Sequence, residues 1–153
     1  MIFKSIKLKK GIAISIFLSL FIIGTILIFI TPTSVKIRYN LTAETKDKEH
    51  ISFNTYQPIE SDKRMKAIII GHGIMVNKEI LKDFAIELAA SGFFVVTCDF
   101  RGHGLSTGEL NRGLLVNDVK AIKKYLERRD DIDNDNLGYV GYSMGGGPGN
   151  KIV

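Results

Sequence analysis

The stretch with the clearest potential for chemistry is Gly141-Tyr142-Ser143-Met144-Gly145, a Gly-x-Ser-x-Gly pattern close to the end of the sequence. This pattern is typical of a nucleophilic serine on a tight turn between a strand and a helix. The dipole of the following helix and the backbone N–H of Met144 would then stabilise a negative charge developing on a substrate oxygen. The alternative for Ser143 is a plain turn at the end of a strand, because Gly and Ser are common in loops.

A nucleophilic serine also needs a general base and an acid that orients it. On such strand-to-helix turns the acid and the histidine follow the serine in the chain. Only ten residues follow Ser143, and none of them is His, Asp or Glu. His72 and His103 precede the serine, so we interpret both as residues that shape loops, and we expect Asp99 and Arg101 to brace the loop around His103.

The elements that must position Ser143 can be predicted from hydrophobic periodicity. Alternating residues in "SVKIRYNLTA" and "HISFNTYQP" predict a β-hairpin closed by "ETKDKE", with Val35, Ile37, Tyr39 and Leu41 on one face. The apolar runs "KAIIIGHG", "FFVVTCDF" and "NLGYVGYS" predict strands buried on both faces.

Two amphipathic helices separate these buried strands. The first is expected between Asn77, a plausible N-cap, and Gly92, a plausible stop. Its predicted inner face is Ile80, Leu81, Phe84, Ala85, Leu88 and Ala89, and that of the second helix is Leu115, Val119, Ile122 and Leu126.

This order of elements predicts an α/β fold with a mostly parallel sheet and flanking helices. Ligand sites in such sheets lie at the carboxyl ends of the strands. Three loops follow those ends, namely "GHGI" (71–74), "DFRGHGLSTGE" (99–109) and "GYSMGG" (141–146).

These three motifs, in this order and spacing, resemble the N-terminal half of an α/β-hydrolase. The branch they resemble most contains lysophospholipases, monoacylglycerol lipases and serine aminopeptidases, and the resemblance covers about residues 35–147. It implies Ser143 as the nucleophile and an oxyanion hole from the backbone N–H groups of Ile74 and Met144. It also implies hydrolysis of an ester, less often an amide, through an acyl-serine, with no cofactor and no metal.

The resemblance stops before the triad acid and histidine of such an enzyme. We therefore expect an N-terminal fragment of a longer hydrolase; the alternative is a truncated relic without turnover. In the family's strand order the next neighbour of the strand ending at Tyr142 comes later in the chain, so we expect an open sheet edge there. The ending "GPGNKIV" also departs from the family, because glycine and proline disfavour a continuing helix.

Residues 11–30, "GIAISIFLSLFIIGTILIFI", contain no charge and are long enough to span a bilayer as a helix. We predict a single transmembrane anchor there, preceded by a basic flank (1–10) and followed by the partial hydrolase domain (31–153). A cleaved signal peptide and a buried core helix are the alternatives. The lysines before the span favour a cytoplasmic N-terminus and an extracytoplasmic C-terminal domain, and the anchor hints at lipid-like ester substrates.

Composition argues against several other classes of protein. The net charge is +5, and four of the lysines lie before the anchor, so no nucleic-acid footprint is expected. Cys98 is the only cysteine, which excludes an intrachain disulfide, and we interpret it as a buried strand residue.

The acidic stretch "DDIDNDN" (130–136) lacks the Gly and Glu of an EF-hand, with Asn136 and Tyr142 at those positions, so we expect a solvated loop between helix and strand.

Overall fold

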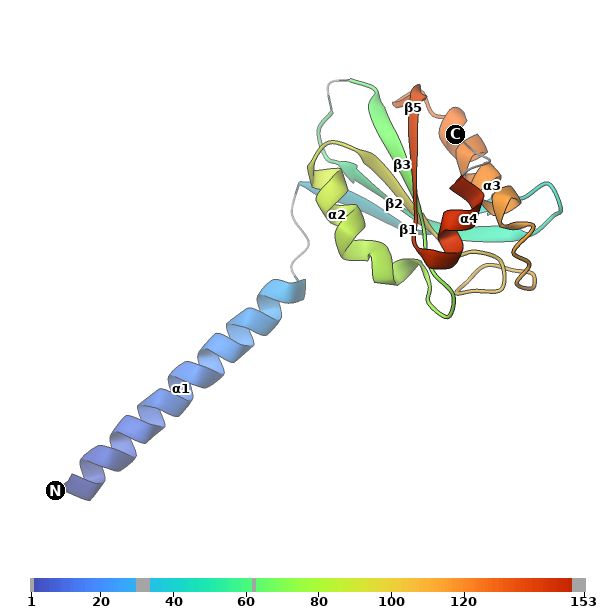
Figure 1. The fold of residues 1–153 in the computed structure, drawn as a ribbon. Helices are drawn as coiled ribbons and strands as arrows, with labels where there is room; N and C mark the ends of the chain where they lie inside the picture. Colours follow the sequence, from blue (N-terminus) through green and yellow to red (C-terminus); the bar gives the residue numbers. More distant parts are fainter. Residues whose placement is uncertain (1, 30–33, 62, 150–153) are drawn as a thin grey trace. The chain divides into compact units, whose positions relative to one another are not determined.

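The computed structural model describes residues 2–29, 34–61 and 63–149 (Figure 1). The last residue of the predicted anchor, Ile30, its exit through residues 31–33, and the C-terminal residues 150–153 lie outside the described residues. The chain divides into two compact units, Met1–Thr31 and Pro32–Val153, which are described separately.

The first unit is one helix, α1 (Ile2–Phe29). It begins before the predicted span, because the lysine-rich flank also favours helix. The window Lys9–Leu27 has a mean hydropathy of 2.2, and none of it is buried. By length and composition alone, this helix could cross a membrane.

The second unit is built on a five-stranded sheet in the order β1-β2-β4-β3-β5. Its strands are β1 (Val35–Glu44), β2 (His50–Pro58), β3 (Met65–Gly71), β4 (Phe94–Cys98) and β5 (Ile132–Gly141). The hairpin β1–β2 is antiparallel and joins β4 in an antiparallel pairing, whereas β3 is parallel to both β4 and β5. This sheet, with helices on its faces, confirms the predicted α/β fold.

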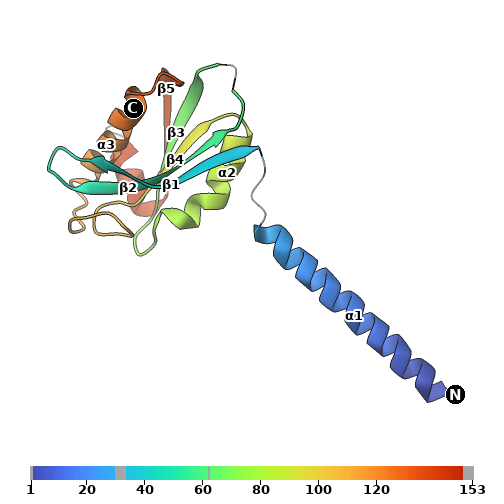
Figure 2. The ribbon, with the colours of Figure 1, turned by 180° about the vertical axis from the view of Figure 1, so that it is seen from behind.

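Helices cover both faces of the sheet. Helix α2 (Lys82–Ala90) follows a short 3₁₀ turn, η1 (Lys78–Leu81), and lies on one face; α3 (Leu115–Glu127) and α4 (Gly146–Gly149) lie on the other (Figures 1 and 2). Each face has its own apolar core. The cluster on the α3 side includes Ile51, Phe53, Phe94, Leu115, Val119, Ile122 and Leu126, so the predicted inner face of α3 is confirmed. The cluster on the α2 side includes Val35, Tyr56, Ile70, Ala85, Ala89 and Val95.

The inner face predicted for the first helix is partly wrong. Asn77 caps the helix as expected, because its side chain accepts a hydrogen bond from the Glu79 N–H. However, Ile80 and Phe84 are 66% and 49% exposed, and Ile86 is buried in their place. The first turn is 3₁₀, with three residues per turn, so the face that meets the sheet is rotated relative to a continuous α-helix.

The alternation predicted for β1 is also interrupted. Arg38 pairs with Thr55 and Leu41 with Phe53, which leaves one extra residue in β1, and Asn40 in this bulge has a φ of 54°. An extra residue reverses which side chains face each side of the sheet. Val35 and Ile37 therefore pack on the α2 side, Leu41 packs on the α3 side, and Tyr39 is exposed.

Strand β5 forms one edge of the sheet in the described part of the chain, as the family's strand order led us to expect. It is consequently not buried on both faces, and Val140 is 42% exposed. The acidic stretch is not a loop before the strand, because Ile132 already pairs with Met65. Asp133 is opposite Lys66 and Leu137 opposite Ala67, so residues 134–136 form a bulge within β5.

Candidate functional site

Ser143 lies at a sharp turn between β5 and the short helical segment η2 (Ser143–Gly145) that leads into α4. Tyr142 is still extended, with φ −98° and ψ 127°, whereas Ser143 has a φ of 51°. A positive φ is unfavourable for a residue with a side chain and persists only where the surroundings impose it. Here the Tyr142 N–H donates to the Gly71 carbonyl at 2.9 Å and the Gly145 N–H donates to the Tyr142 carbonyl at 2.9 Å.

The glycines two positions either side of Ser143 are required by space. A Cβ on Gly141 would lie 2.7 Å from the Cα of Gly146, and one on Gly145 would lie 2.5 Å from the carbonyl oxygen of Gly71. Real Cβ atoms do not approach other atoms so closely. The packing of this turn therefore requires glycine at both positions of the Gly-x-Ser-x-Gly pattern. Between these two glycines, Ser143 is the residue with a positive φ.

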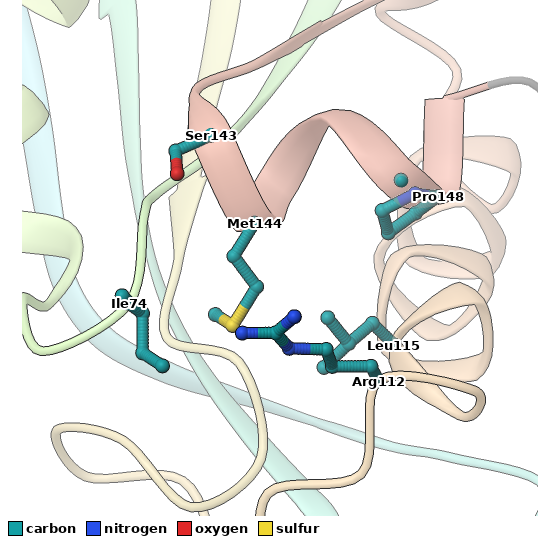
Figure 3. Close-up of a pocket in the computed structure, with 7 residues that line it drawn as sticks. Ile74, Arg112, Leu115, Ser143, Met144 and Pro148 are labelled. Carbon is teal, nitrogen blue, oxygen red and sulfur yellow. The ribbon is translucent and has the colours of Figure 1, made fainter.

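Ser143 opens onto a pocket of about 380 Å³. Figure 3 shows its hydroxyl directed toward the space between Ile74 and Met144. The described residues that line the pocket are Ile74, Arg112, Leu115, Ser143, Met144, Gly147 and Pro148. The structure thus brings together Ser143, Ile74 and Met144, the three residues predicted from the sequence, and adds Arg112, which no sequence pattern indicated.

Both predicted oxyanion donors lie beside the serine. Met144 is in the first turn of η2, where backbone N–H groups have no partner within the helix. The Ile74 N–H has no acceptor among the described residues. Two free N–H groups next to a serine hydroxyl are the arrangement that a developing oxyanion needs. The roles of Ser143, Ile74 and Met144 remain predictions.

His72 is fully buried and acts as a brace between two loops. Its Nε2 accepts from the Phe100 N–H at 3.0 Å, so the proton is on Nδ1, which donates to the Gly73 carbonyl at 2.6 Å. Burial lowers the pKa of the ring, which favours this neutral form. With both nitrogens bonded to the backbone, His72 shapes the loop that carries Ile74, as predicted, and its ring has no free nitrogen to act as a base.

Asp99 has the bracing role predicted for it, through a partner that the sequence did not reveal. Its buried carboxylate accepts from the Lys78 N–H and ammonium, both at 2.7 Å, and from the Leu105 N–H at 3.0 Å. These bonds join the end of β4 to the start of η1 and to the 99–109 loop. Lys78 is 2% exposed, and nothing in its sequence context distinguishes it from a solvated lysine at a helix start.

Arg101 also braces the loop, with two partners. Its guanidinium donates to the buried Asp118 of α3 and to Asp47 in the β1–β2 turn, at 2.6 Å and 2.5 Å for the shortest pairs. The bonds from Arg101 hold the pKa of Asp47 well below its usual range. Asp118 could have been identified from the sequence, because it occupies a position between Leu115 and Ile122 on the inner face of α3.

No group of three or more metal-ligating side chains occurs among the residues that the structure describes. In the acidic stretch, Asp131 pairs with Arg129 at 2.6 Å, and Asp133 accepts from the Asn136 amide at 2.8 Å. These carboxylates are therefore engaged by neighbouring side chains.

Comparison with known proteins supplies the family. The family model described as "Serine aminopeptidase, S33" matches residues 62–151, more than half of the chain. An uncharacterized 31.7 kDa protein of Escherichia coli, from the traX–finO intergenic region, is 32% identical over 97 residues, which cover 61% of this chain and 34% of that protein. The chain therefore spans about a third of the length of this relative.

Solved structures of α/β-hydrolases share the fold. An esterase of Pyrococcus furiosus superposes with a TM-score of 0.64 and 22% identity, over 75% of this chain and 45% of the esterase. Brefeldin A esterase, described as a bacterial homologue of human hormone-sensitive lipase, gives a TM-score of 0.58 and 24% identity, over 75% and 34% of the two chains. At these identities the likeness establishes the fold alone.

Proposed function

Because the chain belongs to the serine aminopeptidase S33 family of α/β-hydrolases, we propose that it carries the nucleophile-bearing part of an enzyme that hydrolyses small-molecule esters. One observation carries this proposal: Ser143 is held at a positive φ on the rim of a pocket that it shares with Ile74 and Met144. That geometry matches the nucleophile turn of this fold.

The proposed reaction begins when the Ser143 oxygen attacks the ester carbonyl carbon while its proton passes to a general base. The carbonyl oxygen becomes an oxyanion and accepts hydrogen bonds from the Ile74 and Met144 N–H groups. Collapse of this intermediate breaks the bond to the alcohol, which leaves with the proton from the base. Water then attacks the acyl-serine in the same way, releases the carboxylic acid and restores the hydroxyl.

We propose that the base and its acid come from outside the residues described. Within the described part of the chain, His72 has both ring nitrogens bonded to backbone groups, and Asp99 is paired with Lys78. This proposal corresponds to the hypothesis that the chain is an N-terminal fragment of a longer hydrolase, which we call the fragment hypothesis. The alternative is a relic of such a hydrolase, which would keep the turn but not the reaction.

Labelling with an alkyl fluorophosphonate tests the nucleophile. We expect Ser143 to be labelled in a version of the chain that also includes the triad acid and histidine, and the Ser143→Ala variant to remain unlabelled. Ser91→Ala, which changes an exposed serine at the end of α2, should label like the parent. Slow labelling of the 153-residue chain beside fast labelling of the longer version supports the fragment hypothesis, whereas a longer version that never labels at Ser143 would refute the proposed function.

We further propose that α1 anchors the chain in a membrane, with the lysine-rich flank in the cytoplasm and the hydrolase unit outside it. The support is the exposed, apolar window Lys9–Leu27 and the lysines that precede it. The intact chain should stay in the membrane fraction through a carbonate wash, and protease added to intact cells should cleave beyond Val35. A soluble product that begins near Thr31 would identify a cleaved signal peptide instead.

A further inference from the structure

Arg112 is the single charged side chain among the described residues that line the Ser143 pocket. The other six lining residues are apolar, apart from Ser143 itself, and none is acidic. Figure 3 shows the Arg112 guanidinium reaching into the pocket from the loop before α3, on the side that also holds the Met144 thioether. A guanidinium is permanently charged, so the pocket beside the serine is electropositive.

Nothing among the described residues neutralises this charge. By contrast, Arg101 and Arg129 each have an aspartate partner at 2.6 Å. Among the described residues, the Arg112 guanidinium has no carboxylate within 4.0 Å and no hydrogen-bond acceptor. Its donors are therefore available to a bound molecule.

The backbone on both sides of Arg112 is fixed. The Asn111 side chain accepts a hydrogen bond from the Gly113 N–H at 3.0 Å, and the Asn111 carbonyl accepts from the Leu114 N–H at 3.0 Å. Leu115, the next residue, is 1% exposed in the core. The backbone that carries Arg112 is therefore held at the mouth of the pocket, while the side chain itself is exposed and open to a ligand.

From this arrangement we infer that Arg112 selects substrates that carry an anionic group, a carboxylate or a phosphate, close to the ester. This inference rests on the proposed function. A guanidinium matches the two oxygens of a carboxylate or phosphate with two parallel hydrogen bonds. The apolar walls formed by Ile74, Leu115 and Met144 suit a short alkyl chain between ester and anion, and a volume of about 380 Å³ restricts the ligand to a small one.

Binding of matched probes tests the inference without requiring turnover. Monomethyl glutarate carries a carboxylate where methyl pentanoate carries a methyl group, so the pair isolates the charge. Each would be titrated by NMR into the full chain with Ser143→Ala, in non-ionic detergent. We expect the anionic ester to bind up to about fivefold more tightly, as for an ion pair with an exposed side chain, and this advantage to shrink as salt screens the charge.

Variants then assign the preference to one side chain. Arg112→Gln should remove the preference, and Arg112→Lys should keep part of it, because lysine retains the charge but loses the two-pronged geometry. Arg128→Gln, which changes an arginine that lines a different pocket, should keep the full preference. A methyl ester of 3-phosphonopropionate replaces the carboxylate probe in a parallel arm, and the tighter of the two anions identifies the substrate class.

Equal binding of the charged and neutral probes, or an unchanged preference in Arg112→Gln, would overturn the inference. Either outcome leaves the fluorophosphonate test of Ser143 intact, so a failure of charge selection is distinguishable from a failure of the proposed hydrolase function.

Discussion

The φ of 51° at Ser143 is sustained by its neighbours. The Tyr139 hydroxyl donates to the Gly145 carbonyl at 2.5 Å, and the Tyr142 N–H bonds to the end of β3. These bonds fix both sides of the serine, while the absence of side chains at Gly141 and Gly145 lets the turn pack against its surroundings. A residue persists in a strained backbone conformation only when several surrounding contacts impose it in this way.

A Gly145→Ala substitution should therefore displace Ser143. The new methyl would lie 2.5 Å from the Gly71 carbonyl oxygen, so the turn must shift. We expect a loss of about 1–3 kcal/mol in the free energy of unfolding, as for other overpacked sites, and a loss of fluorophosphonate labelling at Ser143 in the triad-containing version.

Gly146→Ala is the matched control, because its methyl would meet only the Gly141 carbonyl oxygen, at 3.8 Å. It should be neutral or stabilise the helix by up to about 1 kcal/mol. Equal effects of the two substitutions would show that the turn tolerates a side chain at position 145.

His72 gives the folded chain a pH dependence of definite sign. Burial lowers the pKa of its ring in the folded state, while the unfolded chain takes up the proton near pH 6.5. The stabilisation is therefore complete above about pH 6.5 and is lost as the pH falls toward the folded pKa.

The variant His72→Gln isolates this effect. It should be less stable than the parent by about 1–3 kcal/mol at pH 7.5, because buried backbone groups lose their partners. The difference should narrow as the pH falls to about 5.5, since only the parent loses the contribution of the neutral ring. Urea denaturation of the full chain in non-ionic detergent measures both quantities, with the exposed His50→Gln as control. A difference that widens on acidification would mean that the ring is charged when folded.

At the scale of single residues, the sequence was sufficient where the backbone conformation permits only certain residue types at fixed positions. The two glycines around Ser143 occupy such positions, because only small residues fit. The sequence was not sufficient for Lys78, since charged side chains are nearly always solvated and the surroundings of this one come from distant parts of the chain. The buried ammonium of Lys78 donates a hydrogen bond to Asp99, which lies 21 residues further along the sequence. Arg112 is exposed, as expected of an arginine, and only the fold places it beside the Ser143 pocket.

Among the elements, α3 both covers the sheet and holds the loop before it. Asp118 accepts from the backbone N–H and the guanidinium of Arg101, which also bonds to Asp47 between β1 and β2. One buried arginine therefore ties a helix, a loop and a hairpin together. The loop so held continues through Arg112 into α3, and this network thus supports one wall of the pocket.

An Asp118→Ala substitution should be strongly destabilising. It would leave the Arg101 side chain, which is 3% exposed, with only the partly exposed Asp47 as partner. Breaking a buried ion pair from one side typically costs about 3–5 kcal/mol. The control Asp131→Ala breaks the more exposed pair with Arg129 and should cost less than about 1 kcal/mol. Similar losses in the two variants, measured by urea denaturation, would show that Arg101 has no such structural role.

An element could be predicted from the sequence when residues within that element determine its structure. Helix α3 was predicted with its inner face, because four apolar residues at helical spacing define it. The 3₁₀ start of α2 and the bulge at Asn40 were not predicted, because each depends on pairing with another element. At Asn40 the backbone N–H donates to the side chain of Asn54 on β2, at 2.9 Å.

For the molecule as a whole, the two edges of the described sheet differ in character. Strand β1 carries Lys36, Arg38 and a bulge, features that discourage pairing with another chain. Strand β5 pairs with β3 on one side, and Val140 and Tyr142 near its end are 42% and 69% exposed. An exposed, apolar edge of this kind is a template for association.

We therefore predict that residues 31–153, expressed without α1, associate through β5 or remain loosely packed and bind a hydrophobic dye. Val140→Lys should reduce the association, because a charge on an edge strand opposes pairing, and the side chain is exposed enough to tolerate it. Tyr39→Lys, on the bulged edge of β1, is the matched control and should change little, since that edge is already protected. Sedimentation velocity and dye fluorescence measure the two effects. A soluble monomer with a sharp two-state unfolding transition would contradict the prediction, because it would show that the β5 edge needs no partner.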